Sequence, residues 1–330
     1  MKKFLIILFS FIVASCVEEE QFQDTPQGNF DACWKILNEK YCFFSFKDID
    51  WNDIYYKYKP QVSSNIKKDS LFNILNNMLK ELKDGHVNIY SPFNVGRYWD
   101  WFENYPENFN EDIQKNYIGT NYKIASGMKY IMLPDSIGYI YYSSFSSSIS
   151  NLGLDYILAY FANTKGIIFD VRNNTGGALT NVEAIASRFT NNKYLSGYIS
   201  HKTGSGHNDF SELYPFYVNP SERIHYNKPV AVLTNRHTFS AANNFVGVIK
   251  ILPQVTTIGD ITGGGSGLPF SSELPNGWSI RFSASPIYDN EKKQTEFGIS
   301  PDIKVDMTKK DMENGIDTII ETAIDFILSR

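Results

Sequence analysis

Apolar residues in the second half of the chain follow two spacings, and each spacing predicts a kind of element. The runs 166–172 and 229–234 are largely apolar and indicate buried strands. Each run is followed by a polar turn and then by apolar residues at helical spacing, over 178–189 and 241–252. Strand, turn and helix in this order predict a layered α/β core with parallel strands.

The first part of the chain has helical spacing instead. Amphipathic helices are expected over 30–41, 51–55 and 71–82. Gly85 follows the last of them as a stop signal, so His86 stands just beyond a helix end. A histidine in such a loop is commonly a surface residue, but at the edge of a cleft it can serve as a general base.

The remaining segments are assigned by the same patterns. Residues 91–124 and 191–226 are polar and suggest little regular structure. Further strands are expected at 130–133, 137–142, 255–259 and 278–283, and a closing amphipathic helix at 316–327.

The N-terminus has the pattern of an export signal. Lys2 and Lys3 precede the apolar run 4–13, which ends in small residues and Cys16. The segment 13–16 resembles a bacterial lipobox, which implies a lipidated Cys16; a plain signal peptide with a chance cysteine is the alternative. The acidic run 18–20 resembles the surface-export signal of Bacteroidota lipoproteins, or is a solvated tether. We therefore expect an exported lipoprotein, held at the outer membrane or cell surface by its lipid.

Composition narrows the function further. The chain has 330 residues, 42% of them hydrophobic, and a net charge of −5, so no basic field favours nucleic acid. Cys33 and Cys42 lie too far apart on a straight helix to bridge, and buried or unpaired thiols are expected. The spacing of the histidines does not suggest a metal site; His201, His207 and His225 are expected at the surface.

Ser240 lies between the strand at 229–234 and the helix that follows it. A serine at such a junction has its hydroxyl beside first-turn amides that lack intrahelical acceptors. This geometry suits a nucleophile with an oxyanion site beside it. A plain helix N-cap is the alternative, since serine is favoured there.

A glycine pair marks the other polar turn, at 173–177. Gly176 and Gly177 allow close backbone approach to a ligand and leave amides exposed. A phosphate-binding loop is the alternative, but the lysine and the glycine spacing of nucleotide sites are missing.

Four blocks, in order, resemble the S41 peptidase family, which includes C-terminal processing and tricorn-type proteases. The blocks are 82–86, 166–177, the stretch around Ser240, and 296–302. The resemblance implies a crotonase-like α/β core with an N-terminal helical subdomain and serine peptidase activity. It needs no metal or cofactor.

The resemblance assigns roles residue by residue. Ser240 matches the nucleophile, and the amide of Ala241 with one from Gly176 or Gly177 matches the oxyanion hole. The lysine base of the processing proteases is absent, because Gly265 stands in its place. Two residues match the histidine and glutamate of tricorn-like members instead: His86 as general base and Glu296 as its orienter or a charge stabiliser.

The chain also departs from the family. The gap after His86 leaves no room for an internal PDZ domain, and Asn243 stands where an acidic residue often follows the nucleophile. We expect a signal peptide (1–16), a tether (17–28), a helical subdomain (29–95) and a peptidase core (96–330).

Two other functions remain open at this stage. The lost lysine and the many aromatic residues also suit a non-catalytic surface lipoprotein that binds peptide, lipid or glycan. An acyl-CoA enzyme shares the crotonase-like core, but export argues against an intracellular cofactor. For a peptidase we expect exported peptides or proteins as substrates; oligomeric state is left open.

Overall fold

The computed structural model describes residues 21–330. The expected signal peptide, Cys16 and the acidic run 18–20 lie outside the described residues. Within residues 21–330, no helix combines the length and the apolar character needed to cross a bilayer.

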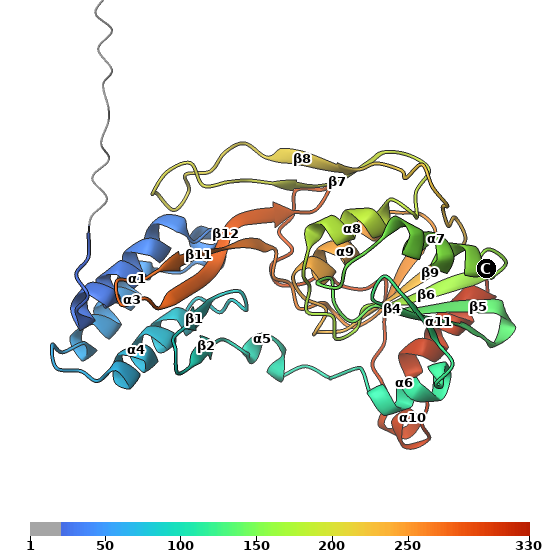
Figure 1. Cartoon of the computed structure of the whole chain (residues 1–330), viewed down its shortest axis with the longest axis horizontal. Helices are drawn as coiled ribbons and strands as arrows, with labels where there is room; N and C mark the ends of the chain where they lie inside the picture. Colours follow the sequence, from blue (N-terminus) through green and yellow to red (C-terminus); the bar gives the residue numbers. More distant parts are fainter. Residues whose placement is uncertain (1–20) are drawn as a thin grey trace, which may run out of the picture.

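A mixed sheet forms the centre of one half of the molecule (Figure 1). Its strand order is β13-β10-β9-β6-β5-β4-β3, parallel from β13 to β5 and antiparallel from β5 to β3. In chain order these strands are β3 (Lys123–Ala125), β4 (Met128–Leu133), β5 (Ile137–Tyr141), β6 (Gly166–Asp170), β9 (Val230–Thr234), β10 (Val255–Gly259) and β13 (Ile303–Lys304).

Both faces of this sheet are covered by helices, which is why its central strands β6 and β9 are largely apolar and fully buried. In β6, Ile167 and Phe169 pack on one face and Ile168 packs on the other. The first face carries α7 (Asn151–Tyr160), α8 (Leu179–Ala186) and α9 (Ala241–Ile249). The second face carries α6 (Glu111–Ile118) and α11 (Thr318–Leu328).

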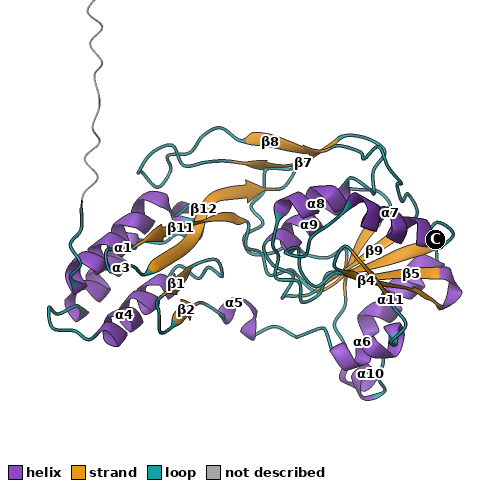
Figure 2. Cartoon of the chain, in the orientation of Figure 1, coloured by secondary structure: helices purple, strands orange, loops and turns teal. Residues whose placement is uncertain are grey.

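The N-terminal helices form a second core in the other half of the molecule (Figure 2). They are α1 (Pro26–Lys40), α2 (Phe44–Lys47), α3 (Trp51–Tyr58) and α4 (Lys68–Lys80). This core includes Ile280 and Phe282 of β12 (Ser279–Tyr288), a strand from late in the chain. The helical half is therefore completed by residues more than two hundred positions downstream. The expected domain boundaries stay a prediction.

Strand β12 is the centre of the second sheet. It pairs with β1 (Asn88–Tyr90), β11 (Gly267–Glu273) and β7 (Tyr194–Ile199). The sheet ends in β2 (Val95–Arg97) beside β1 and β8 (Tyr214–Val218) beside β7. Figure 1 shows β7 and β8 running above both halves of the molecule.

Some assignments from the sequence are wrong. The segment 191–226 contains the β7–β8 pair, and 91–124 contains β2, β3, α6 and the short helix α5 (Asp100–Glu103). The start of α6 is fixed by Asn110, whose side chain accepts hydrogen bonds from the amides of Asp112 and Ile113. A further short helix, α10 (Lys309–Glu313), precedes α11.

Other expectations are confirmed. The mixed α/β architecture has the predicted order of strands and helices around Ser240. Cys33 and Cys42 are buried and unbridged. The two strands that begin within 91–126 do not pair with each other. β2 is an edge strand of the second sheet, and β3 is an edge strand of the central sheet.

Candidate active site

Ser240 lies at the carboxyl end of β9, where the chain turns sharply into α9. Its backbone is at φ 57° and ψ −122°, a conformation that side-chain-bearing residues rarely adopt. Such strain typically costs about 1–3 kcal/mol and is found mainly at functional sites. Although Ser240 occupies the N-cap position, its hydroxyl makes no capping hydrogen bond. The turn therefore presents the hydroxyl to its surroundings.

His86 faces this hydroxyl from the other half of the molecule. Its Nε2 lies 2.9 Å from Oγ of Ser240, although the two residues are 154 positions apart. The backbone amide of His86 donates to Asp84, and Asn88 donates to its carbonyl, so the loop between α4 and β1 is fixed on both sides. The ring also contacts Phe239. The structure thus brings together the predicted nucleophile and the predicted base.

His86 is 4% exposed. Burial lowers the pKa of His86 to about 4, because the charged imidazolium loses its hydration. Arg281 and Lys47 act in the same direction, while Asp84 opposes them. The ring is therefore neutral at pH 7, and its pKa is well below the ordinary value of about 6.5.

Two backbone amides lie beside the nucleophile. Gly177 and Ala241 both line the pocket next to Ser240, and neither amide donates a hydrogen bond to any of residues 21–330. The amide of Gly176 donates to Oδ1 of Asn174 instead. Between the two predicted glycines, Gly177 is therefore the one whose amide is open. A Cβ at Gly177 would lie 2.2 Å from the amide nitrogen of Ser146, so only glycine fits.

At Gly265, the position of the lysine base in the processing proteases, packing leaves no room for a side chain. Gly265 has φ 76°, and a Cβ there would lie 2.4 Å from the ring of Phe239. The amide of Ser240 donates to the carbonyl of neighbouring Gly264, so this glycine-rich loop supports the turn of the nucleophile. A lysine side chain at 265 would have to displace Phe239, which also contacts His86.

Glu296 lies near this site but does not contact the His86 ring. Its carboxylate accepts hydrogen bonds from Nζ of Lys47, at 2.9 Å, and from the amide of Ser266, at 2.8 Å. The other ring nitrogen of His86, Nδ1, is buried and has no partner within residues 21–330. Any effect of Glu296 on His86 therefore passes through intervening groups.

Lys47 and Asp84 lie between Glu296 and His86. Lys47 lies 3.6 Å from a carboxylate oxygen of Asp84 as well as contacting Glu296, and all three side chains are buried. Asp84 also accepts hydrogen bonds from Tyr41, Ser283 and the amide of His86. We refer to Lys47, Asp84 and Glu296 as the lysine cluster.

The lysine cluster holds more negative than positive charge, so its carboxylates have opposite pKa shifts. Burial, together with the charge of Asp84, raises the pKa of Glu296 to about 7. Burial works against ionised Asp84 too, but Lys47 and the hydrogen bonds outweigh it and hold the pKa of Asp84 below its ordinary range. Glu296 therefore takes up a proton first.

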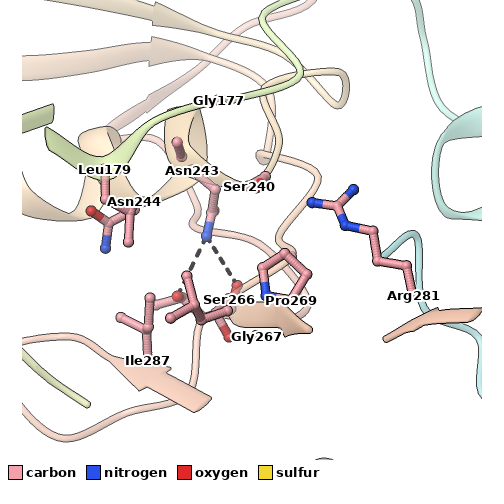
Figure 3. A pocket seen from close by; sticks show the side chains of 14 residues that line it. Gly177, Leu179, Ser240, Asn243, Asn244, Ser266, Gly267, Pro269, Arg281 and Ile287 are labelled. Atoms are coloured by element: carbon pink, nitrogen blue, oxygen red, sulfur yellow. Dashed lines mark hydrogen bonds between the residues drawn. The ribbon is translucent and has the colours of Figure 1, made fainter. Parts of the chain in front are cut away.

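A pocket opens beside Ser240, with a volume of about 150 Å³ (Figure 3). Its wall includes Asn243, whose side chain donates to Thr295 and accepts from Thr262. A more apolar pocket of about 250 Å³ adjoins it, lined by Phe216 and Val248 among others. The two share Leu179, Asn244 and Ile287, so they are direct neighbours.

Sequence reasoning missed the lysine cluster. Asp84 lies two residues before His86 in the block 82–86, but the sequence pattern alone assigns it no role. Lys47 ends an aromatic segment, Phe43-Phe-Ser-Phe-Lys, and a single lysine within apolar residues was the one available signal. Among residues 21–330, no group of three or more His, Cys, Asp or Glu side chains is arranged to hold a metal.

This chain matches only part of the length of its curated relatives. The chain is 25% identical, over 76% of its length, to a candidate tricorn-like protease C-terminal subunit of Sulfurisphaera tokodaii, of which it covers 25%. It is 26% identical over 29% of its length to an uncharacterised protein of Chlamydia muridarum, of which it covers 16%. The chain thus spans a quarter or less of these proteins.

Solved structures match over most of the chain. A candidate peptidase from Parabacteroides merdae is 55% identical, with a TM-score of 0.89, covering 93% of this chain and 98% of that one. Mature CPAF in complex with lactacystin is 13% identical with a TM-score of 0.70, over 92% of this chain and 98% of that one. The tricorn protease is 18% identical with a TM-score of 0.60, over 93% of this chain and 37% of that one. The latter two show the fold alone.

Family models account for both halves of the molecule. The Tricorn protease C1 domain matches residues 22–80, the helical half. The Peptidase family S41 model matches residues 136–305, about half of the chain, and includes Ser240 and Glu296. His86 lies between the two matched segments. The chain therefore belongs to peptidase family S41.

Proposed function

We propose that this S41 family member is a serine endopeptidase that cleaves exported or extracellular peptides or proteins through Ser240, with His86 as general base. The observation that carries the proposal is the 2.9 Å separation of His86 Nε2 and Ser240 Oγ. A serine hydroxyl needs an adjacent base at neutral pH, and no other histidine contacts Ser240 within residues 21–330.

The reaction is an acyl transfer. Nε2 of His86 accepts the proton as Oγ of Ser240 attacks the peptide carbonyl carbon. The carbonyl oxygen becomes an oxyanion beside the open amides of Gly177 and Ala241. His86 then donates its proton to the leaving amine, and water releases the acyl group by the same steps in reverse.

The protonation state of His86 supports this role. A base must be unprotonated, and burial, by lowering the pKa to about 4, keeps the ring neutral at pH 7. Nε2 acts as an acceptor only if the proton is on Nδ1, which is buried. Asp84 fixes the backbone of His86 rather than its ring, so it is a positioning residue.

The test is substitution of the base. Digestion of a peptide library by wild type and by His86→Ala, followed by mass spectrometry, should show a loss of at least ~100-fold in turnover. His237→Ala is the matched control, since His237 precedes the nucleophile in the chain but lies against Trp101 and Phe102. Equal rates for His86→Ala and His237→Ala would reject His86 as the base.

A fluorophosphonate probe separates an enzyme from a non-catalytic binder. Covalent labelling of wild type that Ser240→Ala abolishes supports the peptidase. An intact, folded protein that neither reacts with the probe nor cleaves any library peptide would instead favour the binding function.

We also propose that the mature protein is a lipoprotein attached through Cys16, with the membrane as a partner. The support is the sequence pattern of residues 2–16. Cys16→Ala should release the protein from the membrane fraction or stall its processing. Unchanged membrane partition of this variant would reject the anchor. Multiple acyl chains are required for stable anchoring, since one chain binds only marginally.

A further inference from the structure

The pocket beside Ser240 is lined by charge of one sign, which is positive. Fourteen residues line it, and Arg281 is the only charged residue among them; no aspartate or glutamate belongs to the wall. The remainder of the wall is glycine, small polar side chains and a few aliphatic ones. A ligand in this pocket therefore meets a single positive charge close to the nucleophile.

Arg281 is directed into the pocket by the alternation of β12. Its neighbours Ile280 and Phe282 are fully buried in the core of the helical half. Because side chains alternate along a strand, Arg281 points to the opposite side. Figure 3 shows its guanidinium extending toward Ser240 and Pro269. Across the strands, Arg281 pairs with Asn88 of β1 and Ser271 of β11, which are both uncharged.

No protein carboxylate neutralises this guanidinium within residues 21–330. Arg172 and Arg188, by contrast, are each paired with an aspartate. Arg281 is only partly exposed and offers a planar set of N–H donors that matches a carboxylate. A guanidinium that faces a pocket without a protein carboxylate is available to a carboxylate on a ligand.

We infer that Arg281 binds a carboxylate of the substrate and so selects peptides with an acidic group next to the cleaved bond. This inference deepens the proposed function and rests on it. The carboxylate is either an Asp or Glu side chain or the C-terminus of the peptide, since both present the same pair of oxygens.

The charge of Arg281 also acts on His86, the proposed general base. The positive charge of Arg281 contributes to the low pKa of His86. A carboxylate bound to Arg281 offsets this charge and makes His86 a stronger base when substrate is present. An acidic substrate would then gain in turnover as well as in binding.

An alternative role for Arg281 is stabilisation of the oxyanion. The two roles differ in substrate dependence. A carboxylate-binding residue alters the ratio of kcat/KM between acidic and neutral substrates, whereas an oxyanion stabiliser lowers kcat/KM for both by the same factor. The ratio is therefore the quantity to measure.

The experiment uses decapeptides, each made in matched forms. Side chains near the cleaved bond are Glu or Gln, and the C-terminus is a free acid or an amide. We expect Arg281→Met to lower the acid-to-neutral ratio of kcat/KM by roughly tenfold to a hundredfold, as for a charge-assisted hydrogen bond. Arg281→Lys should retain part of the ratio, and Arg281→Glu should reverse it toward Lys-containing peptides.

Arg330→Met is the matched control, because Arg330 is the exposed last residue and lies over Phe326, away from the pocket. The Glu/Gln and acid/amide comparisons reveal which source supplies the carboxylate. An unchanged ratio in Arg281→Met, even with lower absolute rates, would overturn the inference.

Binding to Ser240→Ala distinguishes this inference from the proposed function. Wild type that cleaves no peptide rejects the peptidase. If Ser240→Ala then binds Glu peptides more tightly than Gln peptides, and adding Arg281→Met removes the difference, the carboxylate site stands. Equal affinity for both forms, with or without Arg281, rejects the site whatever the activity.

Discussion

Two buried clusters, each of one cation and two carboxylates, lie in different parts of the molecule. The lysine cluster joins Lys47 to Asp84 and Glu296 beside the candidate active site. The second, which we refer to as the arginine cluster, joins Arg172 to Asp170 and Asp317 where the carboxyl end of β6 meets the start of α11. Each has one cation between two carboxylates, and all six side chains are buried.

The clusters differ in whether the cation forms hydrogen bonds with both of its carboxylates. Arg172 forms hydrogen bonds with both oxygens of Asp170 and of Asp317, and with the carbonyl of Asn108. Lys47 donates to Glu296 at 2.9 Å and to the carbonyls of Leu82 and Lys83, but it is 3.6 Å from Asp84, too far for a hydrogen bond. A planar guanidinium satisfies two carboxylates at once, and an ammonium here does not.

This difference indicates that the arginine cluster stabilises the fold, whereas the lysine cluster affects the electrostatics of the candidate active site. Asp317 caps α11 through the amides of Ile319 and Ile320, so the arginine cluster fixes that helix to β6. In the lysine cluster the pKa of Glu296 is raised to about 7, so its charge varies near neutral pH. A group that titrates there can alter the electrostatics around His86 without unfolding the protein.

The largest expected effect is from Arg172→Met. It leaves two fully buried carboxylates without a cation, which typically costs ~3–5 kcal/mol of unfolding free energy. Chemical denaturation measures the loss. The control is Arg223→Met, which breaks an exposed pair with Asp155 and should change stability far less. Similar losses for both variants would contradict a structural role for the arginine cluster.

Lys47→Met should cost less, ~1–3 kcal/mol at pH 8, because Glu296 can escape its unpaired charge by taking up a proton. The loss should shrink toward pH 6, where that proton is already present. Turnover should fall as well, since Asp84 holds the backbone of His86. A stability loss equal to that of Arg172→Met at both pH values would remove the distinction between the clusters.

The pH profile of kcat/KM tests the burial of His86. Activity falls as pH drops below the pKa of the base, so a His86 pKa of about 4 places the final acid limb near pH 4. The value expected for an unperturbed histidine is about 6.5. A single limb near 6.5 that is unaffected by changes at Glu296 would mean that His86 titrates as if exposed.

The smallest effect is expected from Glu296→Gln. The change leaves Lys47 with Asp84 alone, an evenly balanced pair, so the unfolding free energy should change by only ~1 kcal/mol. Any inflection of kcat/KM near pH 7 should disappear, because Glu296 is the group that titrates there. An inflection that persists in this variant would have another origin. Lys293→Met controls for disturbance of the same segment, because Lys293 is exposed and pairs with Glu291.

The sequence predicted the central sheet well because its signals are local. Strand β6 is apolar up to its last residue, Asp170, since both faces are buried, and β9 is likewise apolar up to Thr234. Ser240 and His86 were found through short motifs whose residues are contiguous in the chain. The predicted proximity of the pair is confirmed by the distance between them; their catalytic roles stay a prediction.

What the sequence did not predict depends on long-range pairing. Glu296 was expected to act on His86, but its contacts are with Lys47, 249 positions away, and with Ser266. Arg281 looked like an ordinary polar position in an alternating strand until β12 was placed against the helical core. The β7–β8 pair was missed because Ser196 and Gly197 interrupt the apolar run of β7, Pro215 stands inside β8, and neither strand is fully buried.

The candidate active site lies between two cores, so its assembly depends on the folding of both. Ala241 belongs to the core around the central sheet, while Val87 belongs to the core of the helical half. A chain in which only one core has condensed holds a serine without its base or a histidine without its nucleophile. The helical core also includes Ile280 and Phe282 of β12, so the arrangement of Ser240 opposite His86 depends on residues from almost the whole described chain.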